Sequence, residues 1–272
     1  MGSTREDSLQ PTAPLPIEDG IFGLTMLKAK EKQIPHRLRR HSSRKTRNSA
    51  QAESVRQIFE EAKRHYRAGV KQYRVGFRLL KNAAAMECPG AHEWLGAAYD
   101  YGLGTRPNKR RAFDHYRRAA GPQNPNAEYH VGISYLKGRG VRKDQRSAIF
   151  WLRKAAKHGD LTALHVLGHC YRYGYGVSKN PRKGFALELK AARKGEMEAQ
   201  FSTGVCLSNG DGVLASPTEA FKWYMMAARQ GHNDAAHNVA YFYETGRGVR
   251  QNLKRAKQWY SRAKRMRNRR TS

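Results

Sequence analysis

The 272-residue sequence has few cysteines and no long apolar run. Its three cysteines, Cys88, Cys170 and Cys206, cannot make a disulfide framework, so we expect a reducing compartment. No apolar run approaches the ~18 residues of a membrane helix. The short apolar stretch 21–27 is below the length of a signal-peptide core. We therefore expect a cytoplasmic protein without a transmembrane segment, or a nuclear one if the host has a nucleus.

Acidic residues are missing where basic residues are densest. Residues 36–49 contain six Lys and Arg, residues 250–272 contain ten, and neither segment contains Asp or Glu. The formal net charge of the whole chain is +30. Such a charge attracts nucleic acid, an anionic membrane surface or an acidic protein.

Motifs for catalysis and for cofactor binding are also missing from the sequence. The Gly-Arg-Gly of residues 138–140 lacks the preceding strand and the following Gly-Lys-Ser/Thr of a phosphate loop. His165 and His169 lie on one helix face near Cys170, but nothing in the sequence places the remaining ligands of a zinc site beside them. No Ser-His-Asp or Cys-His set is brought together. We predict no enzymatic activity, no cofactor and no metal.

Glycine, in contrast, is abundant and periodic. A Gly-x-Gly pair recurs with a spacing of 36 residues. The pairs are Gly102 and Gly104, Gly138 and Gly140, Gly174 and Gly176, Gly210 and Gly212, and Gly246 and Gly248. The same period relates Ala91, Ala127, Ala163, Ala199 and Ala235. Repeats of this length indicate a stack of similar structural units.

Each unit has the pattern of two helices. Residues 127–136 carry apolar side chains at helical spacing, and Gly138 can take the left-handed conformation that ends a helix. The next helix begins after a residue that can cap its N-terminus. These predicted caps are Asn108, Asp144, Asn180, Ser216 and Asn252. Ser216 and Glu219 also form a capping-box pattern. One hairpin cannot bury both faces, so the hairpins are expected to stack as a solenoid.

The motif A-x-x-x-L/V-G-x-x-Y/C-x-x-G-x-G-V, followed by a capped helix that ends A-A-x-x-G, resembles the Sel-one-like repeat. This family is a close relative of the tetratricopeptide repeat, and the match covers residues 90–264. The resemblance implies an all-α, right-handed α/α solenoid of stacked helix hairpins with a 36-residue period. It also implies a non-catalytic scaffold or adaptor for protein–protein interactions. Glu188 departs from the pattern, because the equivalent residues are apolar or aromatic.

The domain organisation follows from the repeat boundaries. We expect a disordered N-terminal arm over residues 1–54, with a basic tract at 36–49, and a degenerate first repeat over 55–88. Five Sel-one-like repeats would follow over residues 89–264, and a basic C-terminal tail over 265–272.

The sequence suggests two sets of candidate binding residues, one for protein partners and one for polyanions. By the resemblance, the last turns of the first helices line a groove for protein partners, such as an acidic peptide or helix; some of these side chains could instead pack between layers. The predicted partner-binding residues are Tyr101, Lys137, His169, Arg172, Tyr173 and Tyr241.

The alternative function is binding of a polyanion, RNA or DNA, by basic terminal segments on a solenoid support. The residues assigned to it are Arg37, Arg39, Arg40, Arg44, Lys45, Arg47, Lys264, Arg265, Arg267, Arg269 and Arg270. Their charge could also serve only to keep the chain in solution. In either case we expect a monomer.

Overall fold

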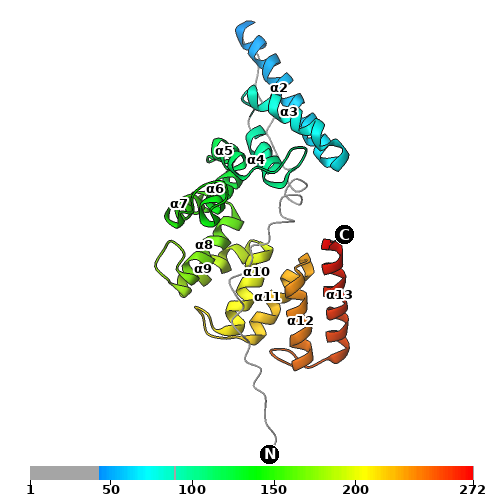
Figure 1. Cartoon of the computed structure of the whole chain (residues 1–272). Helices are drawn as coiled ribbons and strands as arrows, with labels where there is room; N and C mark the ends of the chain where they lie inside the picture. Colours follow the sequence, from blue (N-terminus) through cyan, green and yellow to red (C-terminus); the bar gives the residue numbers. More distant parts are fainter. Residues whose placement is uncertain (1–42, 89, 272) are drawn as a thin grey trace, which may run out of the picture. The chain divides into compact units, whose positions relative to one another are not determined.

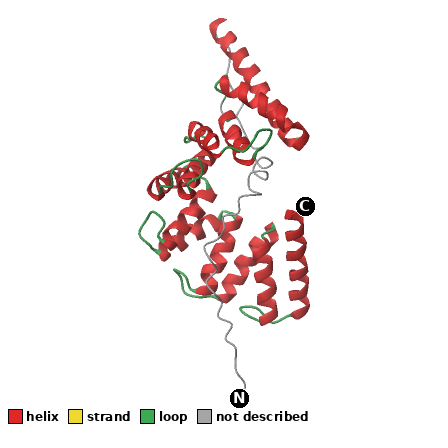
Figure 2. Ribbon diagram, viewed as in Figure 1, coloured by secondary structure: helices red, strands yellow, loops and turns green. Residues whose placement is uncertain are grey.

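The computed structural model describes residues 43–88 and 90–271. In that part of the chain the regular structure is helical and no β-strand occurs (Figure 2). A 3-10 helix at Val70–Gln72 joins the first two α-helices. The α-helices are α2 (Ser43–Arg67), α3 (Tyr73–Ala85), α4 (Ala91–Tyr101), α5 (Lys109–Ala119), α6 (Pro125–Lys137), α7 (Gln145–Lys157), α8 (Leu161–Tyr173), α9 (Pro181–Arg193), α10 (Met197–Asn209), α11 (Pro217–Gln230), α12 (Asn233–Thr245) and α13 (Leu253–Thr271).

Consecutive helices pair as hairpins, from α2 with α3 to α12 with α13 (Figure 1). The second helix of each hairpin then packs against the first helix of the next one. The second helices begin one 36-residue period apart, at Tyr73, Lys109, Gln145, Pro181, Pro217 and Leu253. Contacts between neighbours alone define a solenoid. The predicted all-α solenoid is therefore confirmed.

Most of the predicted N-caps of the second helices are present. The side chains of Asn108, Asp144, Asn180 and Asn252 accept hydrogen bonds from backbone N–H groups in the first turn of their helices. The capping box at Ser216 is wrong, because its side chain makes no such bond. The Ser216 N–H that Glu219 would accept from already donates to the carbonyl of Leu207. Glu219 pairs instead with Lys222, at 2.6 Å between Oε1 and Nζ.

A second series of caps begins the first helices, and the sequence pattern gave no sign of it. The capping side chain accepts from the backbone N–H of the periodic alanine three residues later. The pairs are Asn124 with Ala127, Asp160 with Ala163, Glu196 with Ala199 and His232 with Ala235. Because His232 accepts through Nδ1, the proton of its neutral ring lies on Nε2, which is 3.1 Å from Glu198 Oε2. The position was missed because it holds four different residue types.

The two glycines of each elbow have different roles. Gly138 ends α6 in the left-handed region, at φ 71°. Gly140, at φ 70°, lies against the backbone carbonyl of Lys109, the first residue of α5, so that a Cβ at position 140 would overlap it. The second glycine of the other elbows meets the equivalent backbone of Tyr73, Gln145, Pro181 and Pro217. The second glycine therefore joins each hairpin to the preceding one.

The helical part of the chain begins earlier than predicted from the sequence. Residues 43–54 were assigned to a disordered arm, whereas the structure has them in α2. They contain no Pro or Gly, and they directly precede the part of α2 that packs through the buried Val55. Once packing fixes such a helix, adding further turns costs little. At the other end, α13 runs through Thr271 and includes most of the predicted tail. Residues 1–42 lie outside the described part of the chain.

Candidate protein-interaction surface

The hairpins close around small residues. Leu152 of α7 packs against Gly132 of α6, and its Cγ would lie 2.9 Å from a Cβ at position 132. In α8, Gly168 is the equivalent residue of the repeat, and Glu188 of α9 packs against it. The equivalent contacts elsewhere are Gly96 with Tyr116 and Gly204 with Tyr224. A carboxylate therefore occupies a core position, and Glu188 is 0% exposed.

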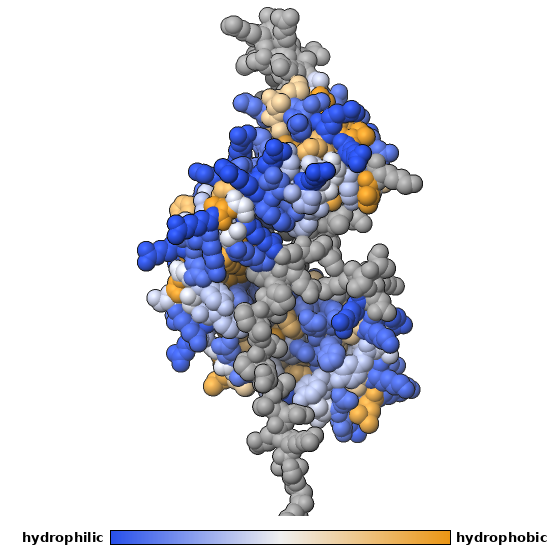
Figure 3. All heavy atoms as spheres, viewed as in Figure 1, coloured by the Kyte–Doolittle hydropathy of each residue, from blue (hydrophilic) through white to orange (hydrophobic). Residues whose placement is uncertain are grey.

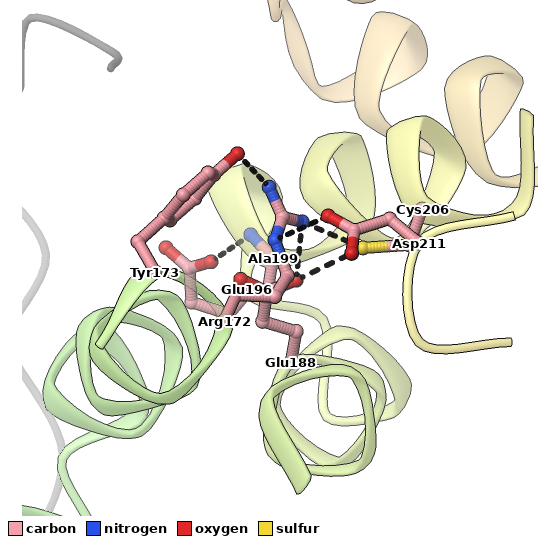
Figure 4. A network of polar contacts seen from close by, with 7 residues as sticks. All are labelled: Arg172, Tyr173, Glu188, Glu196, Ala199, Cys206 and Asp211. Carbon is pink, nitrogen blue, oxygen red and sulfur yellow. Dashed lines mark hydrogen bonds and ion pairs between the residues drawn. The ribbon is translucent and has the colours of Figure 1, made fainter. Parts of the chain in front are cut away.

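Arg172 of α8 neutralises this buried carboxylate (Figure 4). Its Nη1 lies 3.1 Å from Glu188 Oε2, and its Nη2 donates a hydrogen bond of 2.7 Å to the hydroxyl of Tyr173. Its Nε lies 3.1 Å from Asp211 Oδ2, although the angle is not that of a hydrogen bond. The thiol of Cys206 donates to Glu188 Oε2 at 3.4 Å. The network joins two hairpins, since its members come from α8, α9, α10 and the elbow after α10.

Burial decides the protonation chemistry of this network. It raises the pKa of Glu188, and the neighbouring Arg172 guanidinium opposes that shift. Burial also raises the pKa of Cys206, which keeps the thiol neutral and unreactive. Glu188 Oε1 has no hydrogen-bond partner although it is buried. The network is thus a structural ion pair with one unsatisfied oxygen.

Arg172 was predicted to contact partners in the groove, and the structure corrects this. Its side chain is 3% exposed, because Glu188 draws it into the hairpin core. The register of the repeat gave its position along α8 but not the charge that faces it from α9. Glu188 was visible as a departure from the repeat pattern. A buried carboxylate needs a cation, and the basic residue one helix earlier was the signal.

The remaining predicted groove residues differ in exposure. Tyr173 is 42% exposed and Tyr241 is 36% exposed. Tyr101, Lys137 and His169 are partly buried. Burial lowers the pKa of Lys137, and the nearby Asp100 opposes this shift.

Within this set the structure brings together residues of α8. The rings of His169 and Tyr173 lie 4.5 Å apart, and the Arg172 guanidinium lies 4.9 Å from the Tyr173 ring centre. Tyr175, which is not among the predicted residues, completes a small aromatic cluster, and its ring centre lies 6.0 Å from that of Tyr173. Tyr101, Lys137 and Tyr241 belong to α4, α6 and α12.

The candidate metal-binding residues and the cysteines are buried, except for the partly buried His169. Among residues 43–88 and 90–271, no group of three or more His, Cys, Asp and Glu is arranged to hold a metal ion. His165 is 9% exposed, and burial lowers its pKa to about 4. Cys88, Cys170 and Cys206 are buried and carry no disulfide.

The basic segments are described only in part. Lys264, Arg265 and Arg267 are exposed on α13. Arg44, Lys45 and Arg47 lie in α2 and Arg269 and Arg270 in α13, but their side chains are outside the described part, as are Arg37, Arg39 and Arg40 altogether. No α-helix within the described ranges has both the length and the apolar character needed to cross a membrane.

In the described part of the chain, helix hairpins pack mainly against their neighbours around a shared core of small and large residues, and this defines the protein as an α-solenoid repeat protein. The repeats are Sel1 repeats, and the chain belongs to the Sel1 repeat family. Matches cover residues 89–120, 125–160, 161–196, 198–232 and 233–268. No curated protein matches the sequence.

Solved structures agree with this assignment. A Sel1 repeat protein from Oxalobacter formigenes is 29% identical over 70% of this chain and 76% of its own, with a TM-score of 0.66. A protective antigen of uropathogenic Escherichia coli strains, described as displaying an SLR fold, is 23% identical with a TM-score of 0.68. That match covers 83% of this chain and 49% of the antigen. An immunity protein from Pseudomonas aeruginosa is 19% identical over 78% of this chain and 82% of its own, with a TM-score of 0.53, and shares the fold.

Sel1 repeat proteins are generally protein-interaction scaffolds, and they are typically non-catalytic.

Proposed function

We propose that this protein is a non-catalytic adaptor that binds protein partners through its helical-repeat surface, with Tyr173 as an anchor. The family and the solenoid architecture support an interaction role. Tyr173 is chosen as the anchor because it belongs to the partly exposed aromatic cluster with His169 and Tyr175 at the end of α8.

Tyr173 has the properties of an interface anchor. Its ring is 42% exposed, and its hydroxyl accepts a hydrogen bond from the buried Arg172. A side chain held in place by a buried group loses little entropy on binding. Tyrosine is also among the residues that contribute most to protein interfaces. Arg172 acts as a positioning residue in this proposal, because it holds Tyr173 without reaching the surface.

Affinity purification with the full chain as bait tests this function. We expect the same protein partners with and without nuclease, and Tyr173→Ala should reduce their recovery by about fivefold or more. Leu214→Ala is the matched control, because Leu214 is 90% exposed in the α10–α11 elbow and outside the aromatic cluster. Arg172→Ala is unsuitable as a binding test, since it removes a core ion pair. Equal recovery with Tyr173→Ala would exclude this residue as the anchor, and loss of all partners after nuclease would argue against the adaptor.

A polyanion-binding function is the alternative, and the exposed cations of α13 favour it. Lys264, Arg265 and Arg267 have no acidic residue near them in this helix. Binding to phosphates weakens with salt, by a slope of about −0.9 for each contact on duplex DNA. We expect the full chain to bind duplex DNA at low salt and to lose up to about three contacts when these residues are changed to Glu. An unchanged salt slope would exclude α13 as the contact.

On sequence grounds alone we also propose a monomer in the cytoplasm, or in the nucleus of a eukaryotic host.

A further inference from the structure

The exposed face of α7 carries an aromatic residue that the repeat does not require. Phe150 is 58% exposed. Its equivalents in the other four Sel1 repeats are Asp114, Ala186, Lys222 and Gln258, none of which is aromatic. The face of the molecule drawn in Figure 3 is mainly hydrophilic, with hydrophobic residues in small separate areas. A single exposed phenylalanine is ordinary on a protein surface, so its meaning depends on the residues around it.

Phe150 borders a hollow between α7 and the elbow that joins α8 to α9. The hollow has a volume of about 490 Å³, which is within the usual range for ligand pockets. Its apolar lining is Ile149, Phe150 and Val177. A second hollow of about 780 Å³ adjoins it, because both are lined by Arg146, Gly176 and Val177.

Cations surround the apolar lining. The two hollows are lined by Lys143, Arg146, Arg153, Lys154 and Lys157. The single carboxylate in this lining belongs to Asp144, which accepts hydrogen bonds from the first turn of α7. Arg146, Phe150, Arg153 and Lys157 recur at helical spacing and form a continuous stripe along α7. An acidic ligand with an apolar group matches both parts of this surface.

Several of these side chains are already held in place. Arg153 Nη2 donates a hydrogen bond of 2.7 Å to the Tyr171 hydroxyl. Lys154 Nζ lies 4.6 Å from the Trp151 ring centre. On the opposite wall, the backbone N–H of Gly176 donates to Gln145 Oε1 at 3.1 Å, which ties the elbow to α7. A preorganised site binds with a smaller loss of entropy.

We propose that the α7 hollow is a docking site for an acidic peptide segment of a partner protein, with one large apolar side chain seated against Ile149, Phe150 and Val177. Aspartates and glutamates beside that anchor pair with Arg146, Arg153 and Lys157. Charge complementarity and the apolar lining together favour this occupant. Single-stranded nucleic acid usually stacks successive bases on several aromatic side chains, whereas this stripe has one.

This inference rests on the proposed adaptor function and names a second site for it, distinct from Tyr173. The probe is a short labelled peptide, Glu-Asp-Glu-Phe-Glu-Asp-Glu, titrated with the full chain and followed by fluorescence anisotropy. Two further probes separate the contributions. One replaces the central Phe by Ser, and the other is a single-stranded DNA oligonucleotide of the same charge.

Phe150→Ser is expected to weaken binding of the Phe peptide roughly tenfold. Arg146→Glu combined with Lys157→Glu should weaken it by at least a similar factor and reduce its dependence on salt. The charge control is Arg182→Glu, the equivalent of Arg146 one repeat later, which lines neither hollow. The apolar control is Leu214→Ser. Both controls should bind the peptide as the wild type does, and all variants should keep the wild-type helix content.

Equal binding of the Phe and Ser peptides would overturn the proposal, because charge alone would then explain the affinity. Unchanged affinity in Phe150→Ser would overturn it as well. Tighter binding of the oligonucleotide, lost in the same variants, would assign the site to nucleic acid. These failures leave the adaptor function standing if nuclease-resistant partners still depend on Tyr173.

Discussion

Replacing Glu188 by alanine is expected to lower the free energy of unfolding by about 3 kcal/mol. The change leaves the Arg172 guanidinium, which is 3% exposed, without its buried carboxylate partner. Asp211 continues to pair with Arg172 at 3.1 Å, but it is partly exposed and does not replace the buried partner. The alanine also leaves a space over Gly168 that Glu188 fills in the wild type.

Replacing both partners by leucine, as Arg172→Leu with Glu188→Leu, is expected to restore most or all of this stability. The preceding repeat already has this pair, because Leu136 and Leu152 occupy the equivalent positions. Leu152 packs over Gly132 as a leucine at position 188 would pack over Gly168. The substitution also removes the buried Glu188 Oε1, which has no hydrogen-bond partner. Buried ion pairs often contribute no more than apolar residues of similar volume.

Urea unfolding followed by circular dichroism measures both effects. The control is Glu219→Ala, which removes an exposed ion pair with Lys222 and should change stability by no more than about 0.5 kcal/mol. A double variant as unstable as Glu188→Ala would contradict the prediction, and it would mean that the charges stabilise this hairpin beyond what apolar packing supplies. If the double variant is stable and yet loses partners that wild type binds, the role of Arg172 is to position Tyr173.

The sequence was sufficient for the fold because the same residues recur at one period. Helix ends at Gly138 and helix starts at Asp144 follow from local backbone chemistry, and the structure has both. The first-helix caps were not predicted, because Asn124, Asp160 and Glu196 accept the same capping hydrogen bond with different side chains. Periodicity detects identity at a position, and it does not detect a shared chemical role.

The candidate site was harder to predict because exposure depends on what faces a residue. Arg172 and Tyr173 are adjacent in α8, yet one is buried and the other is 42% exposed. The difference comes from Glu188, which lies on another helix. Phe150 was missed for the opposite reason. It stands between Ile149 and Trp151 in an apolar run that is typical of a core, while the structure turns it to the surface.

Gly140→Ala is expected to destabilise the protein by about 3 kcal/mol or more, since it combines backbone strain with a backbone clash. Alanine at φ 70° alone costs about 1–2 kcal/mol. Its Cβ would also overlap the carbonyl of Lys109, which belongs to the helix α5 of the preceding hairpin. Rigid backbone lies on both sides of this contact, so relief requires the two hairpins to move apart.

Gly159→Ala separates the two contributions. Gly159 has φ 98°, and a Cβ there would meet nothing within 4 Å, so only the strain of about 1–2 kcal/mol is expected. Urea unfolding of both variants gives the difference, and limited proteolysis should show new cleavage near the elbow of residues 138–144 in Gly140→Ala alone. Equal losses in the two variants would mean that the clash is relieved at no cost. A larger loss at Gly140 would show that the second glycine of the repeat is required where one hairpin contacts the next, in addition to the turn it makes within its own hairpin.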